Sequence, residues 1–402
     1  MFEECEGGIT AAKGFTAAGV HCGVKKAKLD LAMVASSTPA AGAAVFTTNL
    51  VQAAPVLVDK MQLQRSRAFR AIVVNSGNAN ACTGDRGMRD AWSMVRGCAG
   101  ILNVPEEQVL VSSTGVIGQF LPMEPVCSGM RAAADALAPG GHSDAAAAIM
   151  TTDTFVKEAA LRVSLPDAVV TVGGMAKGSG MIAPNMATML AFVTTDASVA
   201  PDLLHEAVTS AADRSFNRIS VDGDMSTNDM VLVLANGQAG NATLHSPSDP
   251  GYATLAAAIE HLLVRLSKMI VMDGEGATKF IEIRVKGAAG EEAAVCAARA
   301  IANSNLVKTA FHGEDANWGR ILAAIGTSGI AFDPASVEIT FGDVPILRKN
   351  YAIDFSEDAA KTVLSRREIE VIVDLHQGTG SALFWTCDLS KEYVAINANY
   401  RT

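Results

Sequence analysis

The chain is poor in the features that suit a protein to a membrane, a nucleic acid or an export route. Among its 402 residues no uninterrupted apolar run reaches the roughly 18 residues that a membrane-spanning helix needs. Lys and Arg number 32 against 42 Asp and Glu and form no block, so the usual attraction to nucleic acid or anionic lipid is missing. The first residues, MFEECEGG, carry acids where a signal peptide needs bases. We therefore expect a cytoplasmic protein with no nucleic-acid or membrane partner.

Cysteine and histidine are scarce and scattered. The 7 cysteines include no CxxC pair and their number is odd, which is typical of reduced thiols in a cytosolic protein rather than of a disulfide framework. The 7 histidines show neither HxH nor HxxxH spacing, so no zinc site is expected. The sequence therefore predicts neither a metal nor a cofactor.

Several familiar motifs are absent or incomplete. GSGMIA (178–183) fits GxGxxA, but Pro184 follows where a dinucleotide-binding turn must open a helix. VDGDMSTND (221–229) begins like a calcium loop, yet Thr227 stands in place of Gly and Val233 in place of Glu. We interpret it either as a polar turn between strands or as a wall of an active site. No P-loop and no GxSxG elbow is present, which disfavours a P-loop nucleotide enzyme and an ordinary serine hydrolase.

The chain has abundant apolar residues in alternating strand-like and helix-like segments. Apolar residues make up 49% of the chain and charged residues 18%, a folding composition with enough material for a large core. Runs of valine and isoleucine indicate sheets covered on both faces, hence a layered α/β fold. Strands are expected over 71–75, 108–113, 189–196, 230–237, 279–288, 336–347, 368–378, 381–389 and 392–400, and helices over 87–102, 124–138, 201–215 and 252–274.

The segment KGSGMIAPNMATMLAFVTTD (177–196) turns from a polar, glycine-rich loop into a buried strand, and Thr188 stands at the join. A threonine hydroxyl becomes a good nucleophile when its own α-amine is free to act as base, because that amine has a pKa of about 7.7–8.0. An internal threonine reaches that state by attacking the preceding carbonyl, here that of Ala187, followed by an N→O acyl shift and ester hydrolysis. A threonine entering a strand is structural in most proteins, so these residues alone leave both interpretations open.

The wider motif resembles a known family. KGSGMIAPNMATML is closely similar to the self-cleavage segment of the ornithine acetyltransferases, the glutamate N-acetyltransferases of arginine biosynthesis. Further blocks resemble that family in its order along nearly the whole chain: NSGNANACTG, VSSTGVIG, MTTDT, FNRISVDGDMSTND, DGEGATK, EDANWGR and YVAINANYRT.

The resemblance implies an activity and a maturation step. Autoproteolysis between Ala187 and Thr188 would yield an α chain, 1–187, and a β chain, 188–402, assembled as α2β2. Thr188 would then carry acetyl from N-acetylornithine to glutamate in a ping-pong reaction. Acetyl-CoA can be the donor in bifunctional members. The implied fold is an α-β-β-α sandwich of the N-terminal-threonine-nucleophile type with a smaller C-terminal α/β part.

The resemblance also assigns site residues by position. Thr114 and Gly115 of VSSTG match the oxyanion pair. Thr386 is a departure, because the family suggests Gly there, and it puts only local strand packing in doubt. The residues that match substrate ligands are Thr151, Lys177, Thr188, Glu275, Asn397 and the terminal Thr402.

Three alternative functions stay open at the level of sequence. A self-processing N-terminal-nucleophile amidase or aminopeptidase would use the same Thr188 with water as acceptor. A paralogous acyltransferase of antibiotic biosynthesis would keep every motif above. A non-catalytic binding protein on this fold would stay one uncut chain.

Overall fold

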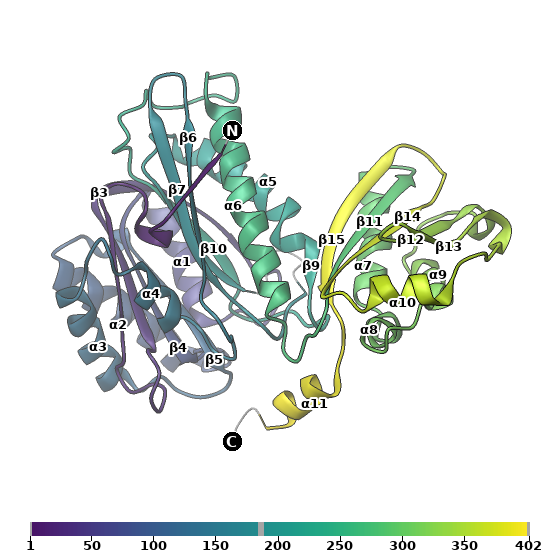
Figure 1. Ribbon diagram of the computed structural model, residues 1–402. Helices are drawn as coiled ribbons and strands as arrows, with labels where there is room; N and C mark the ends of the chain where they lie inside the picture. Colours follow the sequence, from purple (N-terminus) through teal and green to yellow (C-terminus); the bar gives the residue numbers. More distant parts are fainter. Residues whose placement is uncertain (1, 184–188, 400–402) are drawn as a thin grey trace. The chain divides into compact units, whose positions relative to one another are not determined.

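The computed structural model describes residues 2–183 and 189–399 (Figure 1). The chain forms two compact units, each crossed by more than one stretch of sequence. Within the described residues, unit 1 comprises the chain up to Gly178 together with 189–217 and Asp224–Ile270. Unit 2 comprises Ser179–Ala183, Arg218–Gly223 and the chain from Val271 onward.

Unit 1 is built on one mixed sheet in the order β1-β6-β7-β8-β10-β3-β4-β5, with β2 added on β3. The long strand β3 serves both parts of this sheet: its first residues, 31–36, pair with β2, and its last, 41–46, pair with β10. The strands are β1 Glu3–Cys5, β2 Phe15–Val20, β3 Leu31–Phe46, β4 Ala68–Asn78, β5 Val109–Val116, β6 Lys157–Ser164, β7 Val169–Lys177, β8 Leu190–Thr195 and β10 Met230–Ala235. The helices are α1 Ala54–Arg65, α2 Gly84–Leu102, α3 Met123–Asp135, α4 His142–Ala148, α5 Pro201–Arg214 and α6 Tyr252–Met272, whose last turn passes into unit 2.

Alternate residues of the strands feed two different cores, which creates the layers of unit 1. Along β4, Ala71 and Val73 pack against α1, α2 and α3, whereas Ile72 and Val74 share a core with Phe192 of β8 and residues of β10. The strands β7, β8 and β10 form the second β-layer, on the far side of the core that contains Phe192. Helix α6 covers the outer face of this layer, since a Cβ on Gly174 of β7 would stand 3.3 Å from Leu262. The order of layers is therefore α-β-β-α, and the expected layered α/β fold is confirmed.

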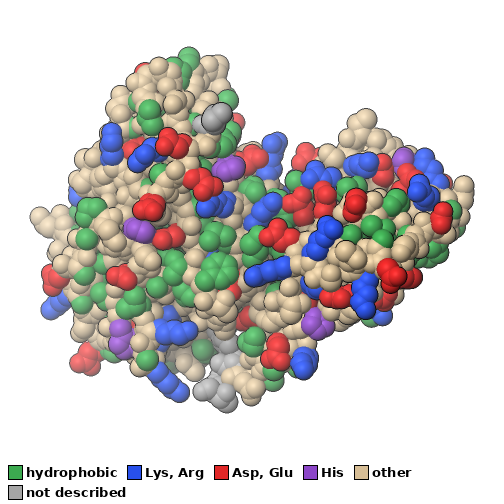
Figure 2. All heavy atoms as spheres, viewed as in Figure 1, with side chains coloured by type: hydrophobic (Ala, Val, Ile, Leu, Met, Phe, Trp, Pro, Cys, Tyr) green, Lys and Arg blue, Asp and Glu red, His purple; other side chains and the backbone are tan. Residues whose placement is uncertain are grey.

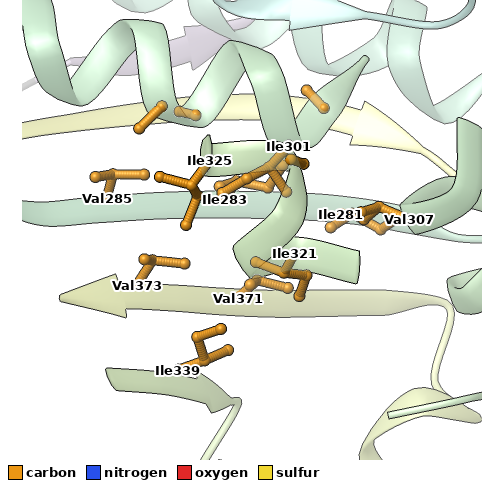
Figure 3. Close-up of a cluster of buried hydrophobic side chains, with 14 of the residues drawn as sticks. Ile281, Ile283, Val285, Ile301, Val307, Ile321, Ile325, Ile339, Val371 and Val373 are labelled. Atoms are coloured by element: carbon orange, nitrogen blue, oxygen red, sulfur yellow. The ribbon is translucent and has the colours of Figure 1, made fainter. Parts of the chain in front are cut away.

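Unit 2 is the smaller α/β part, with the sheet order β13-β12-β14-β11-β15-β9. Figure 3 shows its core, in which Ile281, Ile283 and Val285 of β11 and Val371 and Val373 of β14 pack beneath the helices. The strands are β9 Ile219–Ser220, β11 Phe280–Ala288, β12 Glu338–Phe341, β13 Val344–Leu347, β14 Glu368–Asp374 and β15 Gly380–Cys387. The helices are α7 Glu291–Ala302, α8 Asn305–His312, α9 Trp318–Gly326, α10 Glu357–Leu364 and α11 Lys391–Ala398.

Most expected elements are confirmed. The single strand expected over 336–347 is instead the antiparallel pair of β12 and β13, and one expected element is wrong. The segment 392–400 was expected as a strand from its run of Tyr, Val and Ile, but α11 occupies Lys391–Ala398. Ser390 begins this helix as its N-cap, since its hydroxyl accepts the Glu392 N–H at 3.1 Å. A cap and an acid in the first turn favour the helix, and burial cannot favour a strand because no residue of α11 is buried.

The departure at Thr386 has a packing role. Thr386 is buried in β15, and its hydroxyl donates to the Ser220 carbonyl at 2.8 Å while it accepts from the buried Lys308 Nζ at 2.9 Å. A glycine there could not hydrogen-bond the buried ammonium of Lys308. The hydroxyl therefore contributes to satisfying a buried charge, which otherwise is costly.

Three general findings concern the described helices, the surface charge and the cysteines. None of the described helices combines the length and the apolar character that crossing a bilayer requires. The face in view in Figure 2 intersperses acidic with basic side chains rather than gathering one sign. The seven cysteines are all unpaired.

Replacing Asp59 with Asn is expected to stabilise the protein increasingly as the pH rises. Asp59 is buried in α1, where its Oδ1 accepts the Val111 N–H at 2.8 Å and its Oδ2 has no hydrogen-bond partner among the described residues. Burial raises the pKa of Asp59 well above its usual range, and the Val111 hydrogen bond only partly opposes this. A carboxyl with a raised folded-state pKa contributes its stability below the unfolded value of about 3.9, and loses it as the pH rises toward the folded value.

The measurement is the thermal midpoint of wild type and D59N across pH 4 to 8. We expect the midpoint of D59N to gain on wild type steadily over that interval. A difference between the two proteins that does not change with pH would contradict the assignment of a neutral, buried carboxyl at this position.

Candidate active site

Thr114 and Gly115 lie at the end of β5, where its parallel pairing with β4 becomes irregular. Thr114 pairs with both Ser76 and Asn78, and Gly115 pairs with Gly77. Gly115 has φ +133°, and a Cβ there would stand 2.3 Å from the carbonyl carbon of Gly77, so only glycine fits. Such irregularities disrupt the ladder locally and are over-represented next to active sites. The backbone here is thus of the kind that an oxyanion hole uses.

Buried asparagines fix the backbone around this turn. The Ser113 hydroxyl donates to Asn75 Oδ1 at 2.6 Å, and the Asn75 amide donates to the Asn78 carbonyl at 2.9 Å. From the segment before β10, the Asn228 amide donates to the carbonyls of Ala79 at 2.6 Å and Ser113 at 2.8 Å. The NSGNAN block therefore acts as a clamp on the residue preceding the predicted oxyanion pair.

Thr151 and Lys177 are brought together by a residue that the sequence did not single out, Asp153. Its carboxylate accepts the backbone N–H groups of Thr151 at 2.8 Å and Gly178 at 2.7 Å, and the Lys157 Nζ at 2.7 Å. The side chains of Asp153 and Lys157 are wholly buried. Burial by itself would raise the pKa of Asp153, but the charges of Lys177 and Lys157 and these hydrogen bonds hold it below its usual range. Asp153 is therefore a permanent anion between two predicted substrate ligands.

Lys25 connects this cluster to the oxyanion turn. Its Nζ donates to the Met150 carbonyl at 2.7 Å, next to Thr151, and its Cγ would stand 3.0 Å from a Cβ on Gly77. Burial lowers the pKa of Lys25 to about 8, against the opposing charge of Asp30. No pattern in the sequence distinguishes Lys25 from the other lysines near the N-terminus.

Asp229 is a second buried carboxyl, at the end of the 221–229 segment. Hydrogen bonds from Ser226 and from the backbone N–H of Met189 reach its carboxyl group, and Met189 follows Thr188 in the sequence. Its Oδ2 is buried and has no hydrogen-bond partner in the described part of the chain. Burial raises the pKa of Asp229 well above its usual range, against these hydrogen bonds and the charge of Lys177. A neutral carboxyl can donate a proton as well as accept one, so the segment 221–229 fits an active-site wall better than a plain turn.

Glu275 and Asn397 meet in unit 2. The Asn397 amide donates to Glu275 Oε2 at 2.8 Å, so α11 delivers one predicted ligand directly onto another. Gly276, with φ +70°, lies against the same helix: a Cβ there would stand 2.7 Å from the Tyr393 nitrogen. These contacts place α11 against the DGEG loop.

The segment 179–183 is also anchored in unit 2. Glu275 N–H donates to the Ser179 carbonyl at 2.8 Å, and a Cβ on Gly180 would stand 2.4 Å from the Glu275 carboxyl. The Asp222 carboxylate accepts the N–H groups of Met181 at 2.6 Å and Ile182 at 2.8 Å. The second glycine of GSGMIA therefore lies in close contact with the Glu275 carboxyl group.

The predicted site residues thus fall into two groups. Thr114, Gly115, Thr151 and Lys177 belong to unit 1, and Glu275 and Asn397 belong to unit 2. The remaining predictions, Ala187, Thr188 and Thr402, lie outside the described residues. The sequence missed Lys25 and also Asp153, although Lys157 follows Asp153 at a spacing of four. It marked Asp229 only as part of the 221–229 segment.

Comparison with known proteins identifies the family. The ArgJ family model matches residues 16–402. The arginine biosynthesis bifunctional protein ArgJ of Symbiobacterium thermophilum is 55% identical and covers 98% of this chain and 99% of its own. That of Geobacter sulfurreducens is 52% identical, over 97% of this chain and 99% of its own.

Two solved structures are also similar to parts of this chain. ArgJ from Bacillus halodurans is 45% identical with a TM-score of 0.45, and it covers 46% of this chain and 98% of its own. Ornithine acetyltransferase from Mycobacterium tuberculosis, crystallised with ornithine, is 40% identical with a TM-score of 0.44, and it covers 46% of this chain and 100% of its own. The family suggested by the motifs is confirmed by the whole-length matches: this chain belongs to the ArgJ family.

Proposed function

We propose that this protein transfers an acetyl group from N-acetylornithine to glutamate through an ester on Thr188, in arginine biosynthesis. The observation that carries the proposal is the similarity to curated bifunctional ArgJ proteins over 98% of the chain at 55% identity. The geometry supports it. The glycine turn at Gly115 suits the oxyanion, the buried Lys177 suits the carboxylate of an acetylated amino acid, and the buried Glu275 suits its ammonium group.

Maturation comes first. The Thr188 hydroxyl attacks the Ala187 carbonyl carbon, the peptide C–N bond breaks as the nitrogen takes a proton, and water hydrolyses the resulting ester. The new N-terminal amine then has a pKa of about 7.7–8.0 and serves as general base for its own hydroxyl. Chains 1–187 and 188–402 result, and we propose that they assemble as α2β2.

Acetyl transfer repeats the same chemistry on a substrate. The Thr188 hydroxyl gives its proton to the α-amine and attacks the acetyl carbonyl of N-acetylornithine. The backbone N–H of Gly115 and the hydroxyl of Thr114 stabilise the oxyanion, each worth roughly 3–4 kcal/mol. The α-ammonium returns the proton to the departing amine of ornithine. The amine of glutamate then attacks the acetyl carbon, the bond from that carbon to the Thr188 oxygen breaks, and the α-amine carries the proton from the glutamate nitrogen to that oxygen.

The remaining residues orient the amino acids. Lys177 is 8% exposed and suits the α-carboxylate, because a partly desolvated cation binds an anion strongly. Asp153 links Thr151 to Lys177, because its carboxylate accepts the Thr151 N–H and is stabilised by the charge of Lys177. Glu275, held by Asn397, suits the δ-ammonium of ornithine, and Thr402 is proposed to complete this group. The relatives are named as bifunctional proteins, which supports acetyl-CoA as a second acetyl donor. We propose that the enzyme acts in the cytoplasm.

An intact-mass spectrum before and after incubation with N-acetylornithine tests the proposal. We expect two fragments, one ending at residue 187 and the other beginning at residue 188. One acetyl group should be added to the second fragment only. Adding glutamate must remove that group and yield N-acetylglutamate. Release of free acetate at the same rate without an amine acceptor would instead indicate a hydrolase, and an uncut, unlabelled chain would indicate a binding protein.

Replacing Asn397 with Ala is expected to raise the KM for N-acetylornithine by about 10-fold, because Glu275 loses the amide that orients it. Asn399→Ala is the matched control: Asn399 lies just past the same helix, and its amide bonds to the Ala395 carbonyl at 2.9 Å. Steady-state kinetics on both variants make the comparison. Equal KM values for the two variants would remove Asn397 from the substrate site.

A further inference from the structure

Unit 2 contains a cavity of about 760 Å³ that is lined by none of the predicted site residues. It is formed by the C-terminal half of α7, the first residues of α8 and most of α9. Its charged lining residues are Arg299 and Arg320, and no acidic residue lines it. In a chain of net charge −10, a cavity with two cations and no anion is a distinctive local environment.

Neither guanidinium group is neutralised by a carboxylate of the described chain. Arg299 lines the cavity half-buried, its Nε is buried without a hydrogen-bond partner, and it forms no ion pair within the described residues. Arg320 Nη1 donates to the Leu306 carbonyl at 2.8 Å, which fixes the position of its guanidinium without using its charge. Unpaired arginine forks are the protein groups best matched to bidentate binding of phosphate.

The rest of the lining suits an organic molecule that carries such a group. Leu306, Ala300 and Ala323 supply an apolar wall, and Leu306 is 62% exposed at its rim. Ser304, Asn303 and Thr327 supply neutral polar groups. The volume lies within the range of small-molecule sites and exceeds what a bare phosphate ion fills.

We infer that this cavity binds a phosphorylated small molecule, with its phosphate held between Arg299 and Arg320 and its organic part against the apolar wall. Binding itself does not depend on the acetyl-transfer mechanism, whereas the coenzyme-A alternative below rests on the proposed function. Two sources share this chemistry, the phosphates of a coenzyme-A donor and those of a separate phosphorylated effector.

Titration calorimetry on the purified enzyme tests binding, with coenzyme A, adenosine 3′,5′-bisphosphate and inorganic pyrophosphate as probes. We expect at least one organic phosphate to bind, and Arg299→Gln or Arg320→Gln to weaken it by about 10-fold or more. Arg366→Gln, an exposed arginine of the same unit, is the matched control for net charge and must leave affinity unchanged. A melting curve for each variant verifies folding, and Arg320→Lys keeps a donor for Leu306 should Arg320→Gln unfold.

A footprint independent of activity comes from the cysteines. Cys296 lines the cavity, whereas Cys82 is exposed and lies in unit 1. Bound ligand must slow alkylation of Cys296 and leave Cys82 unchanged. Equal protection of both, binding that survives the double variant, or binding of pyrophosphate alone as an adventitious ion would each overturn the inference.

Kinetics then separate the two sources. If the cavity holds coenzyme A as donor, Arg299→Gln raises the KM for acetyl-CoA and leaves that for N-acetylornithine unchanged. If it holds an effector, both activities of the variant match wild type without ligand, and the ligand alters only the wild-type rate. Either pattern supports the site, and a variant that loses both activities equally while folded contradicts it.

Discussion

Thr188→Ala is expected to leave one chain of 41.7 kDa with no measurable acetyl transfer. The change removes the only hydroxyl that can attack the preceding carbonyl, so neither the acyl shift nor the acetyl ester can form. Loss of a covalent nucleophile typically costs on the order of 10⁴-fold or more in kcat. Gel electrophoresis and intact mass report the cleavage, and a coupled assay for N-acetylglutamate reports the transfer.

Two further variants make this test specific. Thr188→Ser keeps a hydroxyl and is expected to cleave itself and to transfer acetyl, more slowly because the γ-methyl no longer restricts χ1. Thr194→Ala removes the hydroxyl of a threonine six residues further along the chain, in β8, where it donates to the Ile9 carbonyl at 2.7 Å, and it must leave cleavage intact. A Thr188→Ala protein cut after residue 187 would refute intramolecular attack.

Elements governed by local pattern could be predicted from the sequence. The β-branched runs form β4, β5, β8 and β10, because strands buried on both faces need continuous apolar sequence. The long apolar periodicity before Gly274 forms α6. The end of the chain could not be predicted in this way. Its Tyr, Val and Ile favour a strand on propensity, yet the Ser390 cap and the absence of burial leave a helix.

The site could be predicted only where a motif marked it. Thr114 and Gly115 stand in a recognisable block, but the reason that Gly115 must be glycine is the approach of Gly77 from another strand. Asp153 meets Gly178, and Asp229 meets Met189, only through the pairing of β7 with β6 and of β8 with β10. The pKa of a buried carboxyl group depends on the charges and hydrogen bonds around it, and a single sequence does not reveal these.

Asp153→Asn is expected to destabilise unit 1 by about 3–5 kcal/mol, because it leaves the fully buried ammonium of Lys157 without its counter-charge. It also weakens the hydrogen bonds that hold the backbone at Thr151 and Gly178. Thermal unfolding measures the first effect, and kcat/KM for N-acetylornithine measures the second. A variant as stable and as active as wild type would contradict the role of Asp153.

The pH dependence of stability gives an independent signature. The pKa of Asp153 is held below its usual range in the folded protein, so its contribution is complete above the unfolded value of about 3.9 and is lost as the pH falls toward the folded value. Wild type must therefore lose stability on acidification below that unfolded value more steeply than Asp153→Asn. This sign is opposite to that of Asp59, whose neutral form is the stable one.

The double variant Asp153→Asn, Lys157→Met separates packing from function. Removing both buried charges leaves no unpaired ion, and such replacements restore or exceed the stability of the original pair in many proteins. If Asp153 only balances Lys157, the double variant regains both stability and turnover. We expect it to regain stability while kcat/KM stays at least about 10-fold low, since charged hydrogen bonds to the Thr151 and Gly178 backbone and the field beside Lys177 are still missing.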